Sequence, residues 1–247
     1  MESTPEHRAL LGLDVVGSAR NAGHHLNAIS EAVDSMLHTV LPESGIPCAD
    51  VTNWEPTGDG AILTLPSRHL GRLVDLSQRI DGLAAEHNRW YKPDVRLRIA
   101  IELGPVADEP GYYASKISHG RLLNAPAFKK LFERCIEDRP DGAVNTGLIL
   151  SDHAFSSAFG GDYTESVRRP DFVALPVAEK EFAQSSWVRV PGFDSRSLHE
   201  FVRALIPSSA MAEPERDVRV HNEVRGSMNG VQAGTVNGGI SFGGGHR

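Results

Sequence analysis

A glycine-aspartate-glycine turn followed at once by an apolar strand is the feature that most constrains how this chain can fold. The turn spans residues 58–60, and the run 61–65 after it has the composition of a buried strand. Asp-Gly pairs are the commonest hairpin turns, so the turn alone indicates only a hairpin. A second apolar run, residues 10–13, ends in Asp14. If the two strands lie side by side, Asp14 and Asp59 share one edge of the sheet, where their oxygens can hold hard divalent cations. The sequence therefore predicts a two-metal phosphate site.

Length and composition bound the classes of protein that this chain can belong to. With 247 residues and 40% hydrophobic residues, it can hold one domain of roughly 200 residues plus an appendage. A formal net charge of −7 argues against binding to nucleic acid, which needs a basic surface. Cys48 and Cys135 lie far apart, which predicts neither a disulfide framework nor a zinc site. With no signal peptide and no apolar run long enough to cross a bilayer, we expect a soluble, cytoplasmic protein without membrane contact.

Apolar periodicity predicts the remaining elements. Residues spaced by three and four positions predict helices over 26–40 and 68–87. Alternation over 95–106 predicts a strand with one buried face. A helix is expected within the segment 111–128, continuing through Ile136. A buried strand over 147–151 leads into a helix over 154–159 capped by Ser151. The runs 172–177 and 186–192 predict a closing antiparallel pair, and 197–205 predicts a short final helix.

The combination of Asp14-Val15-Val16-Gly17-Ser18 with the 58–60 turn resembles the two metal-binding segments of class III nucleotidyl cyclases. The resemblance covers residues 8–193. It implies a ferredoxin-like α+β sandwich that begins with a βαβ-type unit and has a mostly antiparallel central sheet flanked by helices on one side. It also implies a head-to-tail homodimer with shared active sites. Two Mg²⁺ or Mn²⁺ ions would be bound by Asp14, Asp59 and the carbonyl of Val15, while the turn at Ser18 and Ala19 would meet phosphate.

Two later segments resemble the same family. The strand ending in Gly104-Pro105-Val106 is one, and the run Arg121-Leu122-Leu123-Asn124-Ala125-Pro126 is the other. In the family, an Asn and an Arg one helical turn apart point at phosphate and ribose across the dimer interface. Arg121 occupies the arginine position, but Ile117 stands where the Asn belongs and cannot form hydrogen bonds. Lys180 is the candidate for contact with the terminal phosphates. Without the resemblance, Arg121 reads as a solvated helix residue and Lys180 as an exposed loop lysine.

The resemblance leaves the base of the substrate open. Glu55 matches the position where guanylyl cyclases use Glu and adenylyl cyclases use Lys, and a carboxylate accepts from the guanine edge. The turn and the Arg121–Pro126 run are more similar to the compact pyrimidine cyclases of bacterial Pycsar anti-phage systems. We therefore expect a cyclase that converts UTP or CTP to its 3′,5′-cyclic monophosphate and pyrophosphate. The alternative, favoured by Ile117, is a catalytically silent sensor or adaptor.

The C-terminal segment has a different character. Residues 194–217 predict a short helix and a linker. Residues 218–247 are rich in Gly and Asn and alternate small apolar with polar side chains, a pattern that can stack in register with copies of itself. The segment resembles bacterial amyloid signalling motifs related to animal RHIM sequences, which implies a partner protein that is recruited by templated assembly. A disordered tail, or strands added to the domain's own sheet, are the alternatives.

Overall fold

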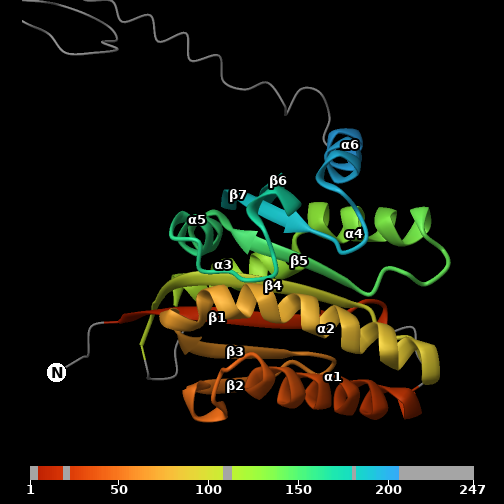
Figure 1. Ribbon diagram of the computed structural model, residues 1–247, viewed down its shortest axis with the longest axis horizontal. Coiled ribbons are helices and arrows are strands. Elements are labelled where there is room, and N and C mark those ends of the chain that lie inside the picture. The colour runs from red at the N-terminus through yellow and green to blue at the C-terminus, as the bar shows by residue number, and fades with distance from the viewer. Residues whose placement is uncertain (1–4, 19–22, 108–112, 180–181, 206–247) are drawn as a thin grey trace, which may run out of the picture. The chain divides into compact units, whose positions relative to one another are not determined.

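A seven-stranded sheet organises the residues that this computed structural model describes, which are 5–18, 23–107, 113–179 and 182–205. The strand order is β2-β3-β1-β4-β5-β7-β6 (Figure 1). Every neighbouring pair is antiparallel except β4 and β5, which confirms the mostly antiparallel α+β fold. The strands are β1 (Glu6–Val15), β2 (Asn53–Pro56), β3 (Ala61–Pro66), β4 (Leu97–Val106), β5 (Thr146–Ser151), β6 (Val173–Glu179) and β7 (Phe182–Arg189).

Six α-helices accompany the strands in the described part of the chain. They are α1 (Gly23–Glu43), α2 (Leu70–Trp90), α3 (Ala114–Asn124), α4 (Pro126–Asp138), α5 (Asp152–Gly160) and α6 (Ser195–Leu205). As predicted, the Ser151 side chain caps α5 by accepting a hydrogen bond from the Ala154 N–H. No helix among the described residues is both long and apolar enough to cross a membrane.

The first four elements place the predicted metal segments on adjacent strands. β3 pairs antiparallel with β1, in a register that sets Ala61 opposite Leu13. β2 pairs antiparallel with the other edge of β3 and therefore runs parallel to β1. The βαβ-type unit expected from the sequence is thus split, because β3 lies between its two parallel strands.

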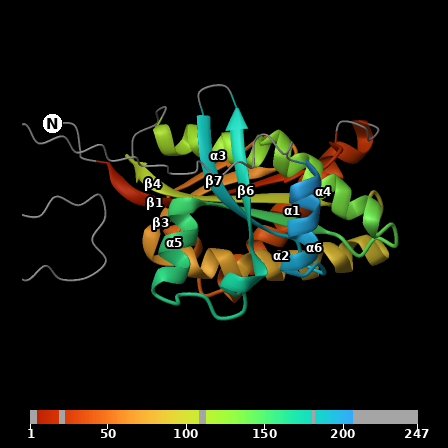
Figure 2. The same cartoon turned by 90° about the horizontal axis from the view of Figure 1, so that it is seen from above.

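Helices cover both faces of the sheet, and the expectation of helices on one side is wrong. α1 and α2 pack on the face that carries Leu11 and Leu13 of β1, where they form the main apolar cluster. The opposite face is covered by α3 and α4. A Cβ atom on Gly12 would lie 2.2 Å from the His119 ring of α3, and one on Gly147 would lie 2.8 Å from the Phe132 ring of α4. Figure 2 shows α2 and α3 on opposite sides of β1 and β4.

Because α3 covers this second face, β4 is buried on both sides. The strand carries Arg98, Ala100 and Glu102 toward α3, and these side chains are 8%, 0% and 5% exposed. The charged residues Arg98 and Glu102 favour a solvated face in the sequence, but both are buried. The prediction that β4 has only one buried face is therefore wrong. The second face of β4 is buried because α3 packs against it, and the alternation of residue types in the strand does not predict this packing.

The helix expected to run past residue 124 is two helices. α3 ends at Asn124, Ala125 takes an extended conformation with ψ near 123°, and α4 begins at Pro126. Proline has no N–H to donate to the preceding turn and disfavours a helical conformation in the residue before it. It is well suited to the first position of a new helix, where it stands.

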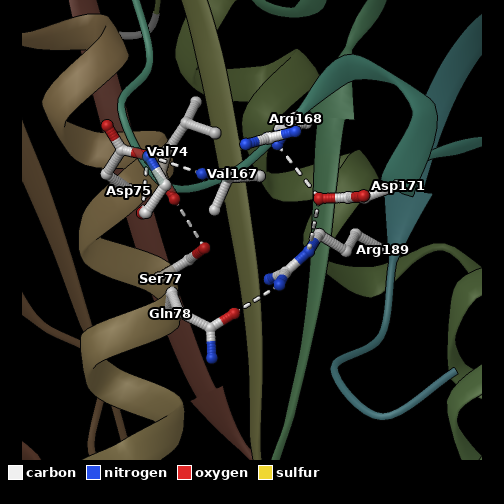
Figure 3. A network of polar contacts seen from close by, with 9 residues as sticks. Val74, Asp75, Ser77, Gln78, Val167, Arg168, Asp171 and Arg189 are labelled. Carbon is white, nitrogen blue, oxygen red and sulfur yellow. Dashed lines mark hydrogen bonds and ion pairs between the residues drawn. The ribbon is translucent and has the colours of Figure 1, made fainter.

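A polar network on α2 fixes the segment that follows α5. The Asp75 carboxylate accepts hydrogen bonds from the backbone N–H groups of Glu165, Ser166 and Val167, at 2.7, 2.9 and 2.9 Å. Nearby, the Arg189 guanidinium donates to Gln78 and lies 3.7 Å from the Asp171 carboxylate (Figure 3). These contacts tie α2 to β7 and account for the largely buried Arg189, so we assign this network a structural role.

Candidate functional site

The glycines of the 58–60 turn bring the two candidate carboxylates to one edge of the sheet. Gly58 has a φ of 94°, which side-chain-bearing residues rarely adopt. A Cβ atom on Gly60 would lie 2.0 Å from the carbonyl oxygen of Leu13 and 3.2 Å from the Cα of Asp14. Only glycine lets the turn approach β1 this closely, and the approach places Asp59 beside the strand end that carries Asp14.

Each carboxylate has a polar partner within the chain. The Arg98 guanidinium, directly across from Asp14 on β4, donates to Asp14 Oδ2 through Nη2 and through Nε, the latter at 3.1 Å. The Ser18 hydroxyl donates to Asp59 Oδ2. Ser18 therefore lies next to Asp59. Arg98 is a site residue for which sequence reasoning gave no role.

A cavity of about 670 Å³ opens beside the Asp14–Arg98 pair. One wall is formed by Val16 and Gly17, which follow β1, next to Arg96 just before β4 and Arg98 within it. α4 and the turn before β4 form the other walls. The residues that complete the lining are Lys92, Pro93, Asp94, Arg96, Arg98, Glu133, Ile136 and Glu137. The lining combines three basic side chains with three acidic ones, and Lys92 is paired with Asp94, so its formal charges balance. Arg98 is the basic lining residue that contacts Asp14.

Glu55 faces the same side of the sheet as Asp14. Glu55 pairs with Ile62 on β3, and Ile62 pairs with Gly12 on β1, two residues from Asp14. Residues directly opposite one another in paired strands share a face. From strand rise and spacing, the Glu55 and Asp14 backbones are roughly 12 Å apart.

Glu55 is held by two donors, and neither was foreseen from the sequence. The Asn53 side-chain amide donates to Glu55 Oε1 from the same strand. The Lys116 ammonium, on α3, donates to the same oxygen at 2.6 Å. The ion pair joins the edge strand β2 to α3. Local sequence carries no signal for it, because 61 residues separate the two partners.

α3 docks on the sheet through small and polar side chains. Ser115 donates to the Pro105 carbonyl oxygen at 3.1 Å, and Ser118 donates to the buried Glu102 carboxylate at 2.6 Å. His119 is fully buried, with its Nε2 3.2 Å from the Ala100 carbonyl oxygen. Burial lowers the pKa of His119 to about 4, against the opposing influence of that carbonyl and of Glu55. The imidazole is therefore neutral at physiological pH.

The opposite face of α3 carries the residues expected at a dimer interface. Arg121 is exposed, and Ile117, one helical turn earlier, is 44% exposed. Val15 lies buried beside Asp14 at the end of β1. The candidates Ala19 and Lys180 lie outside the described residues, as do the linker from 206 and the 218–247 tail.

The donor set fits hard divalent cations. Asp14 and Asp59 supply carboxylate oxygens, the ligands that Mg²⁺ and Mn²⁺ favour. The hydrogen bonds to Asp14 and Asp59 given above all end on Oδ2, so Oδ1 of each carboxylate can serve as a metal ligand. The described residues contain no cluster of three or more His, Cys, Asp or Glu side chains. Any ion here must therefore complete its coordination with backbone oxygen, water or substrate phosphate.

Comparisons of sequence find no match, whereas comparisons of structure find proteins of similar fold. No family model and no curated protein matches the sequence. The adenylate/guanylate cyclase/hydrolase of Silicibacter pomeroyi matches with a TM-score of 0.51 and 16% identity, over 75% of this chain and 97% of that one. A bacterial light-regulated adenylyl cyclase matches with a TM-score of 0.50 and 11% identity, over 82% of this chain and 59% of that one.

A dimeric guanylyl cyclase domain from the fungus Blastocladiella emersonii also matches, with a TM-score of 0.46 and 14% identity, over 75% of this chain and 95% of that one. At these identities the likeness concerns the fold. The described part of this chain therefore has the fold of class III adenylyl and guanylyl cyclase domains.

Proposed function

We propose that this protein is a metal-dependent nucleotide cyclase that converts a nucleoside triphosphate to its 3′,5′-cyclic monophosphate. In this reaction the 3′ oxygen forms a bond to the α-phosphorus, the bond from that phosphorus to the bridging oxygen breaks, and pyrophosphate and a proton leave. One observation carries the proposal. The close approach of Gly60 to β1 sets Asp59 beside Asp14, next to the Arg98 guanidinium, on a cyclase fold.

Different residues of the chain would bind the metal ions and the phosphates of the substrate. Asp14, Asp59 and the Val15 carbonyl would hold two Mg²⁺ or Mn²⁺ ions, which when bound would lower the pKa of the 3′-hydroxyl and stabilise charge on the triphosphate. Arg98 lies on Asp14 and lines the cavity, so its planar fork can donate to phosphate oxygens. The turn at Ser18 and Ala19 would supply backbone N–H groups to the same phosphates.

The remaining residues would come from a second copy of the chain. Arg121, on the outer face of α3, would reach the phosphates bound by the partner protomer and stabilise the charge that develops there. Lys180 is proposed to contact the terminal phosphates. The enzyme would then require a homodimer. We further propose a pyrimidine substrate and a role in bacterial signalling or anti-phage defence, which rest on the sequence resemblance alone.

The test is direct conversion of substrate. The full-length protein is incubated with Mn²⁺ and each of the four ribonucleoside triphosphates in turn, and cyclic monophosphate is measured by mass spectrometry. We expect one nucleotide to be converted preferentially, and Asp59→Ala to reduce the rate by about a hundredfold or more. Glu200→Ala, which removes a 70% exposed carboxylate on α6, is the matched control and should retain full activity. Absence of product from every nucleotide, with folded dimeric protein, contradicts the proposal.

A second candidate is a catalytically silent cyclase-like sensor that signals through its C-terminal segment. The observation that favours it is the exposed, apolar Ile117 at the position of the family's Asn. Asp14→Asn separates the two functions. It should abolish turnover in an enzyme, whereas signalling by a sensor should persist unless metal-bound nucleotide is itself the signal.

A further inference from the structure

The ion pair between Glu55 and Lys116 places a hydrogen-bond acceptor and a donor side by side. Glu55 Oε1 already accepts from both Asn53 and Lys116, so Oε2 is the oxygen left to meet a ligand. The Lys116 ammonium has three N–H donors and uses one of them on Glu55. On the α3 face of the sheet, the pair therefore offers a ligand one carboxylate oxygen, as an acceptor, next to two ammonium N–H bonds, as donors.

The two groups differ in solvent exposure. The Lys116 side chain is 20% exposed and the Glu55 side chain is 44% exposed. A base attached to a sugar enters a site with its far edge first, so the atom at position 4 of a pyrimidine or position 6 of a purine goes deepest. That atom would meet Lys116. The neighbouring ring position, 3 in pyrimidines or 1 in purines, would meet Glu55.

The four bases differ in a systematic way at these two positions. Uracil and guanine carry a carbonyl oxygen at the far position and an N–H at the neighbouring ring position. Cytosine and adenine carry an amino group and a bare ring nitrogen there, so the pattern of donor and acceptor is reversed. An ammonium facing the far position needs an acceptor, and a carboxylate facing the ring position needs a donor. A mismatched base would leave both protein groups unsatisfied.

We propose that Lys116 determines specificity together with Glu55, and that the pair selects bases with a keto group next to a ring N–H. This inference rests on the proposed cyclase function and names its substrate more closely. Guanine gains most from a carboxylate that can accept from its N1–H and its N2 amino group with two oxygens, but only Oε2 is available here. Uracil needs only one oxygen. The pair thus points to UTP as the substrate.

Reversal of the pair tests the proposal without removing the ion pair. In E55K/K116E the acceptor lies deep and the donor lies shallow, and Asn53 can accept from the new lysine through its amide oxygen. We expect the wild-type protein to prefer UTP over CTP and GTP over ATP, by about tenfold in kcat/KM. The reversed protein should invert the order within each pair. R196E/E200R, which reverses the exposed Arg196–Glu200 pair on α6, is the control and should keep the wild-type order.

Binding measurements separate this inference from the proposed function. The same four bases are titrated as 3′-deoxynucleoside triphosphates, which lack the attacking hydroxyl and therefore report binding without turnover. If the reversed pair binds nucleotides but keeps the wild-type order, or if the wild-type protein prefers CTP over UTP, the role assigned to Lys116 is wrong while the cyclase proposal stands. If no nucleoside triphosphate binds to either folded protein, the proposed function itself fails, and the inference fails with it.

Discussion

A position without a side chain controls the distance between the two metal-binding candidates. Gly60 touches the backbone of Leu13 and Asp14 closely enough that no other residue fits without movement of β1 or of the turn. We predict that Gly60→Ala lowers the free energy of unfolding by about 2–3 kcal/mol, because the added methyl group meets backbone that cannot rotate away. Urea titration measures this loss, and cyclase activity should fall with it.

Another glycine provides the control for this prediction. A Cβ atom on Gly82, within α2, would meet nothing within 4 Å. Gly82→Ala should stabilise the protein by up to about 1 kcal/mol, because alanine has the higher helix propensity. If Gly60→Ala is tolerated as well as Gly82→Ala, the close approach of the turn does not organise the site.

The sequence identifies single site residues better than it identifies their partners. Asp14 and Asp59 each follow or precede a recognisable strand, so their meeting at one edge can be predicted. The Arg98–Asp14 contact depends on the register between β1 and β4, and the Lys116–Glu55 contact depends on where α3 crosses the sheet. Local periodicity predicts neither the register of β1 with β4 nor the position of α3 on the sheet, because both are set by tertiary packing.

At the scale of elements, the same distinction holds. Periodicity, capping and alternation predict the helices α1, α2, α5 and α6 and the closing β6–β7 pair. The predicted bounds lie within a few residues of the observed ones. The break before α4 has a signal in the sequence, because Pro126 disfavours a helical conformation in the residue before it. The covered second face could not be inferred, because Arg98 and Glu102 look like solvent-facing residues until α3 is placed above them.

α3 carries a pH-sensitive contact with the sheet. His119 lies over Gly12 with its Nδ1 buried and without a partner among the described residues, and its pKa is lowered to about 4 by burial. In the unfolded chain the same group titrates near 6.5. The unfolded state therefore binds more protons between these values, and stability should fall as pH drops from about 6.5 toward 4. The loss amounts to about 3 kcal/mol at most.

A variant isolates the contribution of His119 from other titrating groups. The free energy of unfolding is measured at pH 7, 5.5 and 4.5 for the wild-type protein and for His119→Asn, which keeps a polar side chain but does not titrate. The variant should be less stable at pH 7 yet lose less stability on acidification. Equal pH dependence in both proteins would show that His119 does not contribute to the acid sensitivity of the α3 contact.

At the scale of the whole molecule, the proposed active site is incomplete in one chain. Asp14 lies at the end of β1 and Asp59 in the turn before β3, whereas Arg121 is an exposed residue of α3. If two chains assemble with two-fold symmetry, each of the two sites takes its carboxylates from one protomer and its arginine from the other. Two defects placed on different protomers then fall together in one site and leave the second site intact.

This geometry predicts recovery of activity from two inactive proteins. Asp59→Ala and Arg121→Ala should each be inactive alone. When equal amounts are mixed and allowed to exchange subunits, half of the dimers are mixed, and each mixed dimer contains one site with both native groups. Activity should rise to about a quarter of the wild-type value. A mixture of Asp59→Ala with Asp14→Ala is the control and should stay inactive, because both defects affect the same half-site. Failure of the first mixture to recover, although subunit exchange is demonstrated, would place Arg121 outside a shared site and leave each chain to act alone.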